Sequence, residues 1–176
     1  MKAGHLSARF FGSLSRRPPS PADLSWAEEL LGPRGFELWR RQPSFDQRHS
    51  LAVARAVQAE LAGTEFAADP RWPACALLHD IGKLDARLGV YGRVVATVAG
   101  AAAGRDMADA WSERGGITRR VGLYLCHPEL GADRIRIAGG PEEAARWAAA
   151  HHSSPWPDDL GIPAPVVVVL HACDND

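Results

Sequence analysis

His79 and Asp80 stand side by side directly after a run of apolar residues, in the segment 76–83 with the sequence ALLHDIGK. A carboxylate beside a buried apolar wall is costly unless it is paired or bound to a cation. A divalent metal ion meets this need, because an imidazole nitrogen and a carboxylate oxygen can both bind it. Gly82 lets the backbone bend just after the pair, where a residue with a β-carbon would resist. The pair therefore predicts a metal site.

This segment resembles the signature of the HD superfamily of metal-dependent phosphohydrolases, in its HDIG(K) form. Family members are similar in having an earlier histidine, the His-Asp pair, up to two later histidines and a distal aspartate, and such residues follow in this order over residues 46–176. The family pattern places the metal-binding histidine first in the pair at 151 and 152, so His152 is expected as a hydrogen-bond donor near the ligands or as an alternative ligand. The resemblance implies six metal ligands, which are His49, His79, Asp80, His127, His151 and Asp174.

Nitrogen and oxygen ligands without thiolate suit Mn²⁺, Fe²⁺, Co²⁺, Ni²⁺ or Zn²⁺. The resemblance implies one or two such ions, with Asp80 as the bridge when there are two. Two ions about 3.5 to 4 Å apart activate a water molecule as hydroxide and neutralise the charge that develops on phosphorus. The implied function is therefore hydrolysis of a phosphoester or phosphoanhydride bond in a small phosphorylated substrate, such as a nucleotide or another metabolite. The implied catalytic residues are Asp80, Lys83 and His152, with Lys83 contacting the substrate phosphate.

Two other functions share these residues. Some HD-fold proteins that resemble this six-ligand pattern are diiron oxygenases. The other alternative is a non-catalytic metal-binding regulatory module, although degenerate relatives of that kind usually lose the His-Asp pair, which this chain retains. In the branch that hydrolyses cyclic di-GMP, a Gly-Tyr-Pro motif follows the paired histidines, whereas Ser153-Ser154-Pro155 stands here. This departure argues against cyclic di-GMP as the substrate.

Helices must position these side chains, and the chain carries the signals for them. Apolar and basic residues alternate with helical spacing after Ser44, so His49 is expected early on a helix. His127 precedes a proline, which disfavours helical geometry at that residue, so we expect it at a junction with a helix that begins at Pro128. An alanine-rich run ends at Ala150 and brings His151 and His152 to the end of another helix.

The last expected helix covers residues 166–173, just before Asp174. Four valines at 166–169 favour a strand by their own propensity. The resemblance implies an all-α fold, however, and we therefore predict a helix here. The predicted architecture is a compact helical bundle of the HD type with a buried metal site between its helices.

The length of 176 residues indicates one domain, predicted at residues 23–176, after a basic and proline-rich extension at residues 1–22. A net charge of -1 gives no general attraction to nucleic acid. The longest apolar run, residues 94–103, is too short to cross a membrane and predicts a buried helix. Three widely spaced cysteines and the absence of a signal-peptide core favour a cytoplasmic protein with reduced thiols. The oligomeric state is left open.

Overall fold

The structure is a computed structural model that describes residues 17–103 and 105–175, and all regular secondary structure in these residues is helical. The predicted all-α fold is confirmed for this part of the chain. Residues 1–16, which hold most of the predicted basic extension, lie outside it. The helices are α2 (Pro21–Arg40), α3 (Ser44–Glu60), α4 (Arg71–Leu78), α5 (Lys83–Ala86), α6 (Val90–Ala103), α7 (Arg105–Ser112), α8 (Gly116–Leu125), α9 (His127–Ile137), α10 (Glu142–Ala150) and α11 (Ala164–Asn175).

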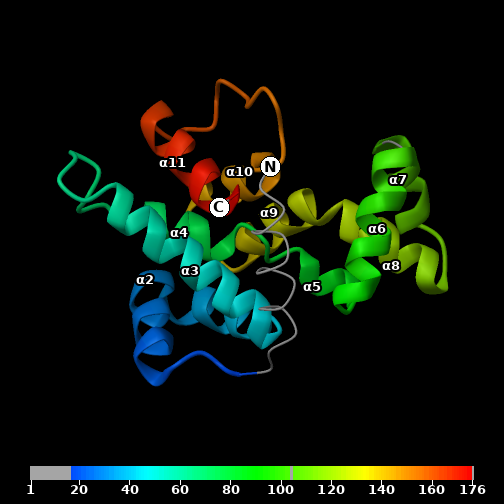
Figure 1. Cartoon of the computed structure of the whole chain (residues 1–176), viewed down its shortest axis with the longest axis horizontal. Helices are drawn as coiled ribbons and strands as arrows, with labels where there is room; N and C mark the ends of the chain where they lie inside the picture. Colours follow the sequence, from blue (N-terminus) through cyan, green and yellow to red (C-terminus); the bar gives the residue numbers. More distant parts are fainter. Residues whose placement is uncertain (1–16, 104, 176) are drawn as a thin grey trace.

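Helix α4 lies at the centre of the main group of helices (Figure 1) and packs against α2, α3, α10 and α11. Residues 72–78 of this helix are all buried, because apolar side chains occupy every side of it. A helix that is apolar all round is stable only inside a core. Since α4 ends within the protein, the next two residues, His79 and Asp80, lie in the interior.

The helix ends bring the other predicted residues towards this point. Helix α9 begins at His127, one residue before the predicted start at Pro128, and α10 ends one residue before His151, as the sequence predicts. Helix α11 includes the four valines at 166–169, so the prediction of a helix is confirmed there. Val166 and Val167 are buried against the core, and this packing outweighs their strand propensity.

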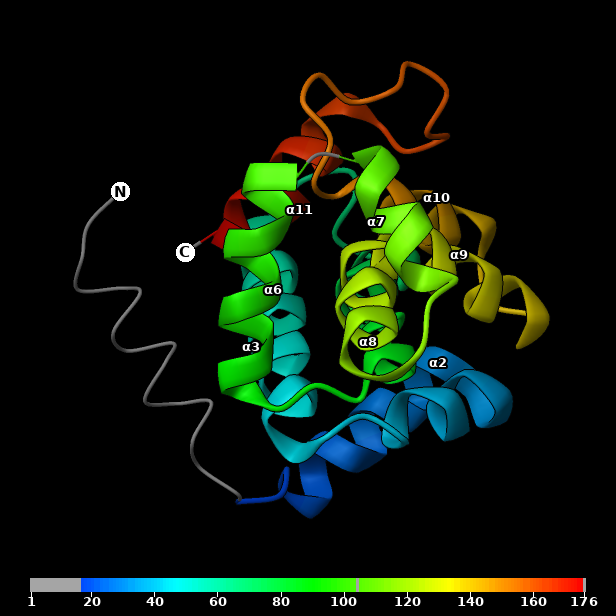
Figure 2. The same cartoon turned by 90° about the vertical axis from the view of Figure 1, so that its right-hand side faces the viewer.

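Helices α6, α7 and α8 form an arm that extends from the main group (Figure 1) and faces the viewer in Figure 2. A small second core, with Leu88 and Ala96 among its residues, lies at the base of the arm. The prediction of a buried helix at residues 94–103 is wrong in its burial, since Val95 and Val98 are 64% and 67% exposed. Among the described residues, α6 packs mainly against α7 and α8 and contacts α3 through Arg93, so much of its surface stays open. None of the helices within the described ranges is long and apolar enough to cross a membrane.

Candidate metal centre

Asp80 lies between two groups of histidines. Its Oδ2 atom is 3.4 Å from Nε2 of His79, while its Oδ1 atom is 3.5 Å from Nε2 of His127 and 3.7 Å from Nε2 of His151. The side chain is only 4% exposed. A single buried carboxylate therefore offers one oxygen to each group.

The first group consists of His49, His79 and Asp174, and their ligand atoms all lie within 4.8 Å of one another. Oδ1 of Asp174 is 3.2 Å from Nε2 of His49 and 3.3 Å from Nε2 of His79. Helices α3 and α11 and the end of α4 supply one residue each, so the group forms only when these three elements pack together.

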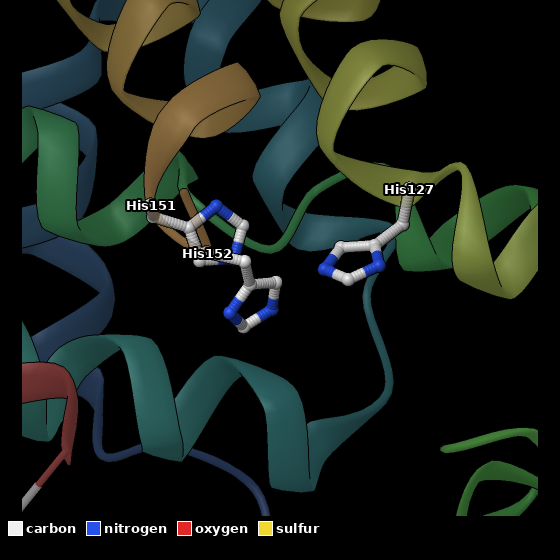
Figure 3. A group of neighbouring side chains, drawn as sticks. All are labelled: His127, His151 and His152. Atoms are coloured by element: carbon white, nitrogen blue, oxygen red, sulfur yellow. The ribbon is translucent and has the colours of Figure 1, made fainter. Parts of the chain in front are cut away.

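The second group consists of His127, His151 and His152, whose ligand atoms also lie within 4.8 Å of one another. Figure 3 shows the rings of His151 and His152, at the end of α10, turned towards the ring of His127 at the start of α9. His151 is buried and His152 is exposed. The extensive packing of α9 against α10 brings the two helix ends together.

Three of these histidines are oriented by the same local contact. Nδ1 of each donates a hydrogen bond to the backbone carbonyl three residues earlier, at 2.7 Å for His79, 2.6 Å for His127 and 2.7 Å for His151. A carbonyl can only accept, so Nδ1 of each ring carries a proton and Nε2 points to the centre, with its lone pair free whenever the imidazole is neutral. This is the arrangement that second hydrogen bonds give to metal-binding histidines.

The atoms that face one another at the centre have no hydrogen-bond partner. Nε2 of His79, His127 and His151 and Oδ1 of Asp80 are all buried and unsatisfied, since their mutual contacts are longer than hydrogen bonds. Buried polar atoms without a partner are destabilising. A divalent ion on each side of Asp80 would satisfy them with the nitrogen and oxygen ligands that such ions prefer. The residues present therefore fit one or two metal ions.

Charge at the site follows from burial and from close neighbours. Burial lowers the pKa of His79, but the carboxylates of Asp80 and Asp174 outweigh this effect and raise it to about 10. Burial opposes ionisation of both carboxyls, yet their pKa values are held well below the usual range, chiefly by Lys83 and His79 for Asp80 and by His79 for Asp174. Although the residue as a whole is exposed, desolvation of its ring against His127 and His151, together with the positive charges nearby, lowers the pKa of His152 to about 3, so its imidazole is neutral. Both carboxyls are therefore ionised, and without a metal ion the positive charges that face them are those of Lys83 and the His79 imidazolium.

Lys83 and Gly82 connect the centre to the turn that follows it. Nζ of Lys83 donates a hydrogen bond to Oδ2 of Asp80, and its side chain is 16% exposed. Gly82 packs so tightly on the first turn of α9 that a β-carbon there would lie 1.9 Å from the carbonyl oxygen of His127. The turn between α4 and α5 is thus fixed against the helix that carries one of the histidines.

All six predicted ligands lie in the two groups or between them, and Lys83 and His152 lie in contact with them. The sequence analysis did not predict that backbone carbonyls orient the histidines. The last carbonyls of a helix have no intrahelical partner, so a histidine at a helix end is placed to donate to the carbonyl three residues before it. No family model, no curated protein and no solved structure matches this chain.

Proposed function

We propose that this protein is a metal-dependent phosphohydrolase of the HD type, which cleaves a phosphoester or phosphoanhydride bond in a nucleotide or another small metabolite. The proposal rests on one observation. Four buried atoms that can bind a metal, three histidine nitrogens and one oxygen of Asp80, converge without hydrogen-bond partners, and the Asp80 carboxylate lies between the two groups. When bound, divalent ions supply Lewis acidity, which lowers the pKa of water and neutralises charge on a phosphoryl group.

In this proposal each group would hold one ion, and the Asp80 carboxylate, with one oxygen towards each group, would serve both. His79 and His151 are 2% and 0% exposed at their side chains, whereas His49 is 29% and Asp174 is 13% exposed. Each group therefore has an edge open to solvent, at His49 and Asp174 in the first group and at the exposed His152 in the second, and substrate reaches the centre from these edges. The buried histidines exclude bulk water from the space between the edges and so strengthen electrostatic interactions within the site.

Lys83 and His152 have different roles in this mechanism. The ammonium of Lys83 neutralises Asp80 and lies at the edge of the centre, where it can contact a phosphate oxygen. A group with a pKa of about 3 is a weak base, so His152 acts as a ligand or as a hydrogen-bond donor and not as a general base.

The test compares three variants by elemental analysis and by hydrolysis of a panel of nucleotides and phosphoesters. Asp80→Ala removes the carboxylate between the groups, so metal content and hydrolysis should both be lost while circular dichroism stays helical. Lys83→Ala should raise KM much more than it lowers metal content. Asp158→Ala, an exposed carboxylate in the loop before α11, is the matched control and should behave like the wild type.

Two outcomes would count against the proposal. Hydrolysis by Asp80→Ala at the wild-type rate would remove Asp80 from the reaction. Two iron ions per chain with substrate-dependent oxygen uptake, and no hydrolysis with Mn²⁺ under anaerobic conditions, would instead identify an oxygenase built on the same ligands.

A further inference from the structure

A cavity of about 880 Å³ lies beside the metal centre, between α5, α8, α9 and the start of α3. None of the six candidate metal ligands lines it, but Lys83 does, so the cavity and the centre share this one side chain. Asp85 is the only acidic residue in its wall. Six arginines line it, which are Arg41, Arg87, Arg93, Arg119, Arg120 and Arg134.

Two of these arginines are held by carboxylates. Arg93 makes two hydrogen bonds with Asp46, at 2.6 Å and 2.8 Å, and Arg134 makes two with Asp85. These bidentate pairs fix both guanidinium groups. The pair with Arg134 also neutralises Asp85, the acidic residue of the cavity wall. The wall therefore carries no uncompensated negative charge.

The other four arginines have no carboxylate partner within residues 17–103 and 105–175. Arg120 donates from Nε to the carbonyl of Ala86, and no ion pair joins Arg41, Arg87 or Arg119 to an acid there. Like charges gathered around one cavity repel one another and create a positive potential inside it. The planar guanidinium group matches phosphate oxygens in pairs, and an anion with several phosphate oxygens therefore complements this wall.

Arg87 also has an unusual backbone. Its φ is 49°, and among the described residues no other residue except glycine has a positive φ. A residue with a long side chain seldom adopts this left-handed conformation, and such strain is typically kept at functional positions. The strained position lies directly after α5, on the rim of the cavity.

The cavity lies within reach of the metal centre along α9. His127, Leu130 and Arg134 are three and four residues apart and so share one face of that helix, with His127 in the centre and the other two in the cavity wall. From His127 to Arg134 the helix rises by about 10 Å. A ligand of small-molecule size can therefore contact both places.

We propose that this cavity binds the phosphate chain of a small molecule that carries two or more phosphate groups. The proposal is independent of the hydrolytic function, because binding does not require turnover; an assay for released orthophosphate after each titration shows that the measured heat is that of binding. A nucleic-acid polymer is the competing ligand of similar chemistry. The net charge of -1 provides no extended attraction to it.

The experiment is isothermal titration of the full-length protein, as purified, with inorganic tripolyphosphate, orthophosphate and a short single-stranded oligonucleotide. The variants are Arg87→Gln, Arg119→Gln and Arg119→Lys. Arg114→Gln, an exposed arginine outside the cavity wall, is the matched control. Tripolyphosphate can also withdraw a metal ion from the candidate centre, but this contributes equally to the titrations of the wild type and all variants. A difference in affinity between two of these proteins therefore reflects binding in the cavity.

Tripolyphosphate should bind more tightly than orthophosphate, and each glutamine variant should weaken its binding by about tenfold. Arg119→Lys should fall between the wild type and Arg119→Gln, because it keeps the charge and loses the paired contact. Arg114→Gln should match the wild type. The proposal is overturned if the wild type does not bind tripolyphosphate, if the cavity variants match Arg114→Gln, or if the oligonucleotide binds more tightly than tripolyphosphate.

Discussion

The contact between Gly82 and helix α9 provides the sharpest test of how the metal centre is held together. In Gly82→Ala the new β-carbon would lie 1.9 Å from the carbonyl oxygen of His127 and 2.6 Å from the backbone nitrogen of Gly131. Cβ contacts shorter than 3.0 Å are essentially absent from proteins, and both partners here are backbone atoms. The turn and α9 must therefore separate by about 1 Å.

This movement has two measurable consequences. Overpacking of a close-packed contact costs about 1 to 3 kcal/mol, which lowers the Tm of a chain of this size by roughly 3 to 10 °C. The same movement carries His127 away from Asp80, from which it is separated by 3.5 Å between Nε2 and Oδ1. A displacement of about 1 Å at a reacting centre lowers turnover by about 100-fold. The second group should also lose its ion.

Thermal melts with and without chelator, and metal content per chain, measure both effects. Gly131→Ala is a graded comparison, because its β-carbon would lie 3.1 Å from the backbone nitrogen of Gly82, and it should cause a smaller loss. Gly89→Ala is the matched control, since no atom lies within 4 Å of its β-carbon. A Gly82→Ala protein with the wild-type Tm and full metal content would refute the reasoning.

Two further predictions concern the histidines. His151→Ala should lose one metal ion per chain, whereas His152→Ala should keep its full metal content. The reason is that His151 is buried and its Nδ1 is bonded to a carbonyl, whereas His152 is exposed. The reverse result in elemental analysis would exchange their roles. Without bound metal, the pKa of His79 is about 10 in the folded protein and about 6.5 in the unfolded chain. Protonation of His79 therefore stabilises the folded protein fully below pH 6.5, and this stabilisation is lost as the pH rises towards 10. The Tm of chelator-treated protein should therefore fall as the pH rises from 6.5 to 9, while metal affinity rises because the ion competes with that proton; a Tm that climbs over this range would contradict the assignment.

The sequence by itself predicted the all-α class, through the family resemblance, together with the ends of the helices next to the candidate ligands and the types of residue that can hold a metal. Helix starts and stops depend on signals within one or two turns, such as the proline after His127 and the glycines after α9, and these can be read locally. The HDIG(K) resemblance singled out His79, Asp80 and Lys83 because few functions other than metal binding call for a charge in that apolar setting.

The burial of individual side chains could not be predicted from the sequence, because it depends on how the helices pack. Helices α6 and α11 both contain valine-rich runs, yet Val95 and Val98 of α6 are exposed whereas Val166 and Val167 of α11 are buried. Which side of a helix is covered depends on its neighbours, and no local signal encodes those neighbours.

Only the tertiary structure decided the geometry of the site. His49 and Asp174 are 125 residues apart in the chain and 3.2 Å apart in space, because α3 and α11 both pack against the buried helix α4. The same packing puts Asp80 between the two groups of candidate ligands and gathers arginines from five helices or their ends around one cavity. Distances between residues far apart in sequence are set by the packing of whole helices, and local spacing carries no information about them.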